Sequence, residues 1–143
     1  MRHQYLLQLF VIFLTSFGVT SAHAEGDSTP LEHAFFIGVK DGDTVHSPLK
    51  IGFGVTGMTI APAGTDTPNT GHFHLLIDTE MSSEQLKAAI PSDAHHVHFG
   101  KGQQEAEITL SPGKHQLQLL LGDGKHIPHH PPIVSHPITV TVQ

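Results

Sequence analysis

The chain contains no cysteine among its 143 residues. Neither disulfide bonds nor thiolate metal ligands are therefore available, and an exported domain of this sequence must depend on packing and sheet hydrogen bonds. Positive charge is also scarce, because seven Lys and Arg residues stand against thirteen Asp and Glu and the formal net charge is −6. This balance argues against nucleic acids and anionic membranes as partners.

Long apolar segments are scarce as well, and the one at the N-terminus is short. Arg2 precedes an apolar run over residues 6–19, and small residues follow at 21–24. The run is shorter than the roughly 20 residues that cross a bilayer, and the small-x-small pattern after it is typical of a secretory signal peptide. We expect residues 1–24 to be removed, leaving a periplasmic or secreted protein with no stable membrane span.

Two cleavage points satisfy the small-residue rule. Ala22-His23-Ala24 favours cleavage before Glu25, whereas Thr20-Ser21-Ala22 would leave His23 as the first residue. An N-terminal histidine could bind copper through its amine and its imidazole. The sequence favours Glu25 and leaves the other reading open.

A flexible lead-in is expected at residues 25–33, followed by a single β-domain over 34–143. Seven short runs rich in β-branched and aromatic residues alternate with Gly, Pro and Asp turns, which predicts an all-β, immunoglobulin-like antiparallel β-sandwich of about seven strands. These runs cover residues 35–40, 49–56, 72–78, 96–99, 105–110, 115–121 and 138–142. One short helical insertion is expected at 82–89, where Ser82 and Gln85 have capping-box spacing.

Histidine is the most over-represented residue, with fourteen in the chain. His72 and His74 lie two apart on an expected strand, so both imidazoles leave the same face. The spacing recurs at 96–98, and a third histidine-bearing segment, stiffened by prolines, spans 126–132. Three segments could thus converge on one ion, and the candidate metal ligands are His72, His74, His98, His126 and His129.

An imidazole-rich site without thiolates suits a copper or zinc ion. Asp78 and Asp123 are available as further ligands or as hydrogen-bond partners of the ligands, and Met58 and Met81 leave a Cu(I) site open. Metal binding requires neutral imidazoles, so the affinity should fall below about pH 6. The first hypothesis is an exported metal carrier, buffer or sensor.

Two other classes of function compete with metal binding. A non-metal binding module would recognise a cell-envelope protein or glycan, with the histidines as hydrogen-bonding or pH-responsive groups. An enzyme is the least supported, because there is no nucleophile elbow, phosphate-binding loop or zinc-protease motif. A structural role is favoured over a ligand role for His33, His46, His115 and His136.

Three long strings, at residues 61–78, 96–105 and 112–135, resemble the bacterial domain-of-unknown-function 4399 family. Members of that family are small exported proteins with no established activity, so the resemblance implies export and no particular chemistry. Family sequences often have three consecutive histidines after the glycine, where this chain has Phe73 in the middle, which indicates that the middle position faces the core. The histidines within these strings include His72, His74, His98, His115, His126 and His129.

Overall fold

The protein, seen in a computed structural model that describes residues 32–143, folds into two β-sheets with almost no helix. The strands of the smaller sheet are β1 (Ala34–Ile37), β3 (Leu49–Val55) and β7 (Glu105–Ile108). The larger sheet contains β2 (Thr44–Val45), β4 (Thr59–Ile60), β5 (Thr70–Ile77), β6 (His96–His98), β8 (Gly113–Gly122) and β9 (Ile138–Val142). The expected all-β sandwich is confirmed.

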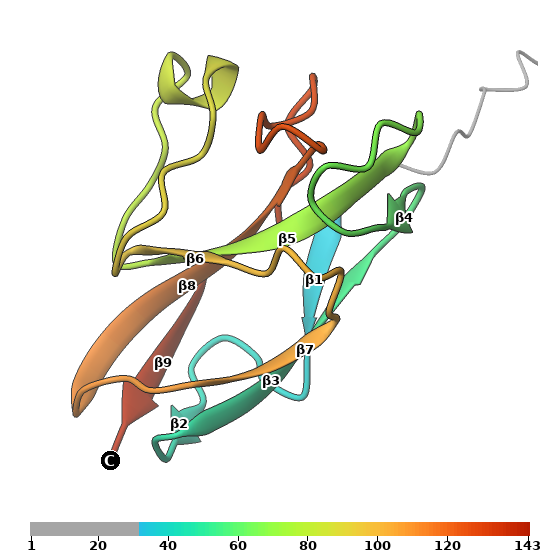
Figure 1. Cartoon of the computed structure of the whole chain (residues 1–143). Helices are drawn as coiled ribbons and strands as arrows, with labels where there is room; N and C mark the ends of the chain where they lie inside the picture. Colours follow the sequence, from blue (N-terminus) through green and yellow to red (C-terminus); the bar gives the residue numbers. More distant parts are fainter. Residues whose placement is uncertain (1–31) are drawn as a thin grey trace, which may run out of the picture.

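The strand order is β1-β3-β7 in the smaller sheet and β2-β9-β8-β5-β4 in the larger, with β6 also paired to β5 (Figure 1). All seven expected strands are present with shifted ends. The two additional strands, β2 and β4, have two residues each and pair in parallel with β9 and β5. Such short strands carry too little alternation to be recognised in a sequence.

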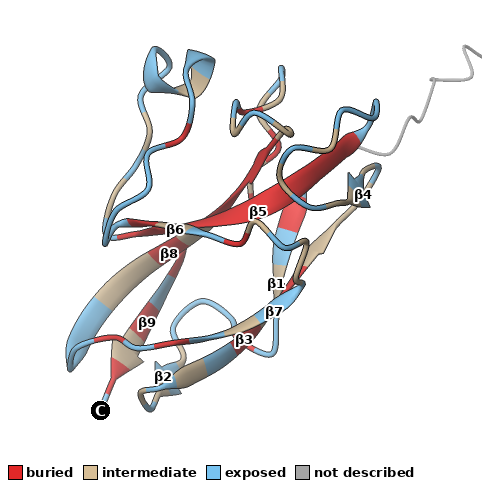
Figure 2. Ribbon diagram, in the orientation of Figure 1, coloured by how far each residue is buried: buried red, intermediate tan, exposed pale blue. Residues whose placement is uncertain are grey.

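Strand β5 is buried along its whole length (Figure 2). Phe73, Leu75 and Ile77 point into the core between the sheets. The ring centroids of Phe73 and Phe53 lie 5.4 Å apart there. Burying an aromatic or branched side chain of this size contributes roughly 1.5–3 kcal/mol relative to exposure. The position of Phe73 confirms that the middle residue of the GHFH string faces the core.

The alternate residues of β5 leave the opposite face of the larger sheet. Two long connections rise above this outer face, residues 78–95 between β5 and β6 and residues 123–137 between β8 and β9 (Figure 1). The backbone N–H of Ile90 donates to the carbonyl of His126 at 2.8 Å, which joins the two connections. The outer face is thus covered by irregular chain and not by a second sheet.

The expected helix at 82–89 is a single 3₁₀ turn, η1 (Gln85–Lys87). The capping-box spacing is realised, because Ser82 N–H donates to Gln85 Oε1 at 2.9 Å and Gln85 N–H donates to Ser82 Oγ at 3.3 Å. The turn buries no side chain and the backbone is extended again at Ala88. A helix this short needs packing to propagate, so it ends after one turn.

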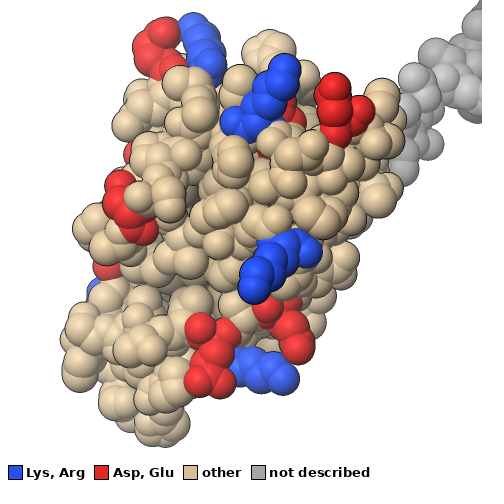
Figure 3. All heavy atoms as spheres, viewed as in Figure 1, with Lys and Arg blue, Asp and Glu red and all other residues tan. Residues whose placement is uncertain are grey.

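The expected signal peptide, with both cleavage points, lies outside the described residues. Over residues 32–143, no helix is long and apolar enough to cross a membrane. On the face shown in Figure 3, acidic and basic side chains are scattered singly or in small mixed groups over a surface that is mostly uncharged.

Candidate metal centre

Strand β5 supplies two buried imidazoles to the outer face of the larger sheet. His72 and His74 have exposed fractions of 0% and 1%, and their Nε2 atoms lie 3.1 Å apart. Their Nδ1 atoms make no hydrogen bond within the described chain. A buried polar atom without a partner destabilises the fold by about 1–3 kcal/mol, so this face retains groups that packing alone does not explain.

Strand β6 brings a third imidazole onto the same face. His98 is the Cα partner of His74 in the antiparallel β5–β6 ladder, so both side chains leave the sheet in the same direction. Two nearby glycines leave room for the rings: a Cβ at Gly100 would collide with the His98 imidazole, and a Cβ at Gly122 would lie 3.0 Å from His74 Nε2. The glycines therefore form part of the cradle around the imidazoles.

A tight turn after β8 supplies the fourth imidazole. His126 has a φ of +67°, the left-handed region that a non-glycine residue enters at a cost of about 1–2 kcal/mol. Asp123 holds this turn, because its Oδ1 accepts hydrogen bonds from the N–H groups of Lys125 (2.8 Å) and Ile127 (2.9 Å). Strain held by surrounding bonds is common at functional sites.

The loop that follows β4 ties the third and fourth imidazoles together. Ala63 N–H donates to the carbonyl of Gly100 at 2.9 Å, and Gly64 N–H donates to the carbonyl of Gly124 at 2.8 Å. Gly100 lies two residues after His98 and Gly124 two residues before His126. Two consecutive backbone bonds thus fix the spacing between the segments that carry the outer imidazoles.

The four imidazoles form one compact cluster, which we call the imidazole cluster (His72, His74, His98 and His126). Every pair of ring centroids is separated by 4.7–5.9 Å. Ring nitrogens of His72, His98 and His126 lie within 4.8 Å of one another, and the Nε2 atoms of His98 and His126 are 3.2 Å apart. These three histidines could hold a metal ion.

The shortest nitrogen separations match those around a tetrahedral ion. Nitrogens bound at 2.0–2.1 Å in a tetrahedral zinc site are about 3.3–3.4 Å apart. The separations in the cluster are 3.1 Å within the β5 pair and 3.2 Å between His98 and His126. To bind one ion with all four nitrogens, the His72/His74 pair and the His98/His126 pair would have to move closer together. The nitrogen separation within each pair would change little.

Three imidazoles of the cluster have lowered pKa values. Burial, together with the nearby His98 and His126, lowers the pKa of His72 to about 4. Burial, followed by the other three imidazoles of the cluster, lowers the pKa of His74 to about 3. The pKa of His98 is also lowered, by burial and by His126. Neutral imidazoles offer the lone pairs that a metal ion requires.

The fifth candidate ligand, His129, lies outside the cluster. Its Nε2 packs against the backbone at Gly71, where a Cβ would come within 2.9 Å, and it makes no hydrogen bond within the described chain. His96, which shares the strand of His98, donates from Nδ1 to Asp93 at 2.8 Å, while its Nε2 is buried and without a partner. His96 is therefore oriented by a carboxylate but does not join the cluster.

The two acidic candidates have structural partners. Asp78 accepts a 2.6 Å hydrogen bond from His115 Nδ1 and a 2.8 Å bond from the backbone N–H of Gln116. Asp123 organises the turn that carries His126. The sequence interpretation overlooked the two cradle glycines and the Ala63-Gly64 loop, and the only signal available for them was the presence of glycine next to each histidine segment.

Comparisons with known proteins place the chain in a family without assigning an activity. A search of curated proteins found no match, and a search of solved structures found none either. A family model described as a domain of unknown function matches residues 51–143, which include the whole imidazole cluster and both of its cradle glycines. The chain therefore belongs to the DUF4399 family, as its sequence strings indicated.

Proposed function

We propose that this protein is an exported metal-binding protein that carries or buffers one zinc or copper ion in the imidazole cluster. The observation that supports it most directly is the convergence of four imidazoles from three separate segments, with all ring centroids within 5.9 Å of one another. His72 and His74 form the buried inner pair. His98 and His126 form the outer pair, which is less buried.

The chemistry of the donor set favours borderline cations. All four donors are imidazole nitrogens, which suit zinc and copper and suit calcium or magnesium poorly. The two short nitrogen separations, 3.1 and 3.2 Å, lie between those of a tetrahedral and a flatter tetragonal site, so both Zn(II) and Cu(II) fit the donor set. No thiolate competes for the ion, because the chain has no cysteine.

The proposed location follows from the expected signal peptide. Removal of residues 1–24 would place the mature domain in the periplasm or outside the cell. In those compartments thiols oxidise, so an all-imidazole site binds metal without the redox liability of cysteine. The absence of cysteine and the abundance of histidine then have a common explanation.

The direct test is native mass spectrometry of the exported protein, with Zn(II) and Cu(II) titrations of the chelator-treated form at pH 7.5. We expect one ion per chain and a thermal midpoint that rises by roughly 10 °C at a free metal concentration of 100 Kd. Replacing both inner ligands, in H72A/H74A, should weaken binding by more than about a hundredfold. Loss of mere hydrogen-bond partners of ligands already weakens metal sites by roughly 10- to 100-fold.

A matched control removes two histidines outside the cluster. H46A/H136A deletes the same number of imidazoles and should bind the ion as the native chain does. Equal binding by all three proteins, or only millimolar binding by the native chain, would contradict the proposal. The histidines would then be a hydrogen-bonding surface, and the search would turn to a cell-envelope protein or glycan.

A further inference from the structure

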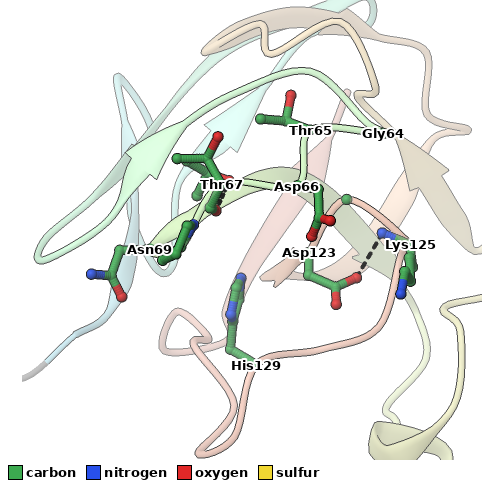
Figure 4. A pocket seen from close by; sticks show the side chains of 11 residues that line it. Gly64, Thr65, Asp66, Thr67, Asn69, Asp123, Lys125 and His129 are labelled. Atoms are coloured by element: carbon green, nitrogen blue, oxygen red, sulfur yellow. Dashed lines mark hydrogen bonds between the residues drawn. The ribbon is translucent and has the colours of Figure 1, made fainter.

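A polar cavity of about 600 Å³ lies beside the imidazole cluster (Figure 4). Its walls are the loop at residues 64–70, which leads into β5, and the turn at 123–125, which leads to His126. His129 completes the lining. The same two segments that line the cavity therefore continue directly into two of the proposed ligands, His72 and His126.

The charged groups of the cavity favour a cation. Asp66 and Asp123 contribute two carboxylates, and Lys125 contributes the one basic side chain among the lining residues. His129 adds an Nε2 atom that is buried and makes no hydrogen bond within the described chain. In Figure 4 the Asp66 carboxylate and the His129 ring face the space between the two loops, and the Asp123 carboxylate faces the backbone N–H of Lys125.

Asp123 connects the cavity to the imidazole cluster. It lines the cavity, and its Oδ1 accepts hydrogen bonds from the N–H groups of Lys125 and Ile127, the residues on either side of His126. A cation in the cavity would therefore lie against the turn that carries one of the proposed ligands.

We propose that this cavity is the entrance through which a hydrated divalent cation reaches the imidazole cluster, with Asp66 and Asp123 attracting it and His129 as its first protein ligand. The proposal rests on the metal-binding function proposed above. It explains why His129 lies next to the cluster with a free nitrogen and yet does not belong to it. A cleft whose carboxylates outnumber its basic side chains attracts a cation and raises its association rate.

The entry step involves only ligand exchange. The ion enters with its water shell, exchanges one water for the lone pair of His129 Nε2, and then exchanges the remaining waters for the imidazoles of the cluster. No bond of the protein is broken and no electron is transferred. Because His129 holds the ion only in transit, its loss should change the rates of binding and release together and leave the equilibrium affinity nearly unchanged.

The experiment is stopped-flow Zn(II) binding to the metal-free full chain, followed by competition with a chromophoric chelator. H129Q and D66N should each slow association by about threefold or more, and K125Q should accelerate it, while Kd changes by less than about twofold. Asp66 is exposed and makes no hydrogen bond within the described chain, so D66N should leave the fold intact. The effect of D66N should shrink in high salt, where the attraction is screened.

E105Q is the matched control. It also removes one negative charge, but from an exposed pair with Lys50 on the smaller sheet, and it should leave the association rate unchanged. Association rates for H129Q, D66N and K125Q equal to that of E105Q would overturn the entrance while leaving the metal site in place. Loss of affinity in H129Q to the extent seen in H72A/H74A would make His129 a resident ligand and would also overturn it. Failure of the native chain to bind either Zn(II) or Cu(II) would overturn both proposals.

Discussion

The imidazole cluster and His115, a single histidine on strand β8, show opposite shifts in pKa. In the imidazole cluster the rings face one another, and burial holds the pKa of His72 at about 4 and that of His74 at about 3. At the other end of the same sheet, His115 donates from Nδ1 to Asp78 at 2.6 Å and from Nε2 to the carbonyl of Ser111 at 2.8 Å. The hydrogen bond to Asp78 raises the pKa of His115.

The difference depends on where the carboxylate lies. Asp78 contacts His115 directly, and the second ring nitrogen of His115 contacts the carbonyl of Ser111, so neither nitrogen is available to a metal ion. Asp123 lies close enough to His72 for its charge to oppose the lowering of the His72 pKa. Its Oδ1, however, accepts the hydrogen bonds that hold the turn carrying His126. The protein therefore contains a structural histidine whose ring nitrogens both have partners, and a group of buried histidines whose pKa values are lowered; only the second suits a metal ion.

The largest expected effect is acid destabilisation of the metal-free protein. The pKa values of His72 and His74 lie below the 6.5 of an unfolded histidine, so their contribution to stability is complete above pH 6.5 and is lost as the pH falls toward 4 and 3. We expect the free energy of unfolding to drop by on the order of 3 kcal/mol between pH 7 and pH 4.5, measured by urea denaturation.

The two double variants separate this effect from general acid denaturation. H72A/H74A should be less stable at pH 7 and should show a flatter dependence on pH, whereas H46A/H136A should keep the native slope. If the free energy of unfolding depended on pH equally in all three proteins, burial of His72 and His74 would not be the cause of the acid destabilisation.

A second prediction uses the cradle around the outer imidazoles. A Cβ at Gly100 would collide with the His98 ring, so G100A should displace that ligand and weaken Zn(II) binding about tenfold, which corresponds to about 1.4 kcal/mol. G52A is the control, because its Cβ would press on Ile37 in the smaller sheet at 3.0 Å. It should lower stability and leave the metal affinity unchanged. Equal Zn(II) affinities in calorimetric titrations of both variants would show that Gly100 is not needed to position His98 for metal binding.

The smallest expected effect concerns the pair formed by Asp78 and His115. D78N should lower the free energy of unfolding by about 0.5–1 kcal/mol near pH 5.5, because it removes the ionic partner of His115. The pKa of His115 is raised, so the contribution of the pair is complete below pH 6.5 and is lost as the pH rises through the folded pKa. The deficit of D78N should therefore shrink by pH 9 in urea titrations. A loss of stability in D78N that grew with pH would contradict the stabilisation of protonated His115 by Asp78.

The alternation of residues in β5 was readable in the sequence. A period of two put Phe73 and Leu75 on one face and His72 and His74 on the other, and the structure has this arrangement. The β-sandwich followed from the spacing of short runs and turns. These features are local, because each depends on neighbours within one strand or one turn.

The composition of the imidazole cluster depends on contacts that no local pattern encodes. His98 faces His74 only because of the register between β5 and β6, and His126 reaches the cluster only because the turn after β8 is held by Asp123. Spacing within the proline-rich segment did not distinguish His126 from His129. The distinction comes from a left-handed backbone at one of them and the proximity of Gly71 to the other.

The complete burial of β5 also constrains the register of the whole larger sheet. A slip of one residue would turn the imidazoles of His72 and His74 into the apolar interior and expose Phe73 and Leu75. A metal site built from β5, β6 and the turn after β8 would therefore form only in the correctly paired chain. Wherever unfolded chains meet proteases, an ion bound in this way would protect correctly folded copies in preference to mispaired ones.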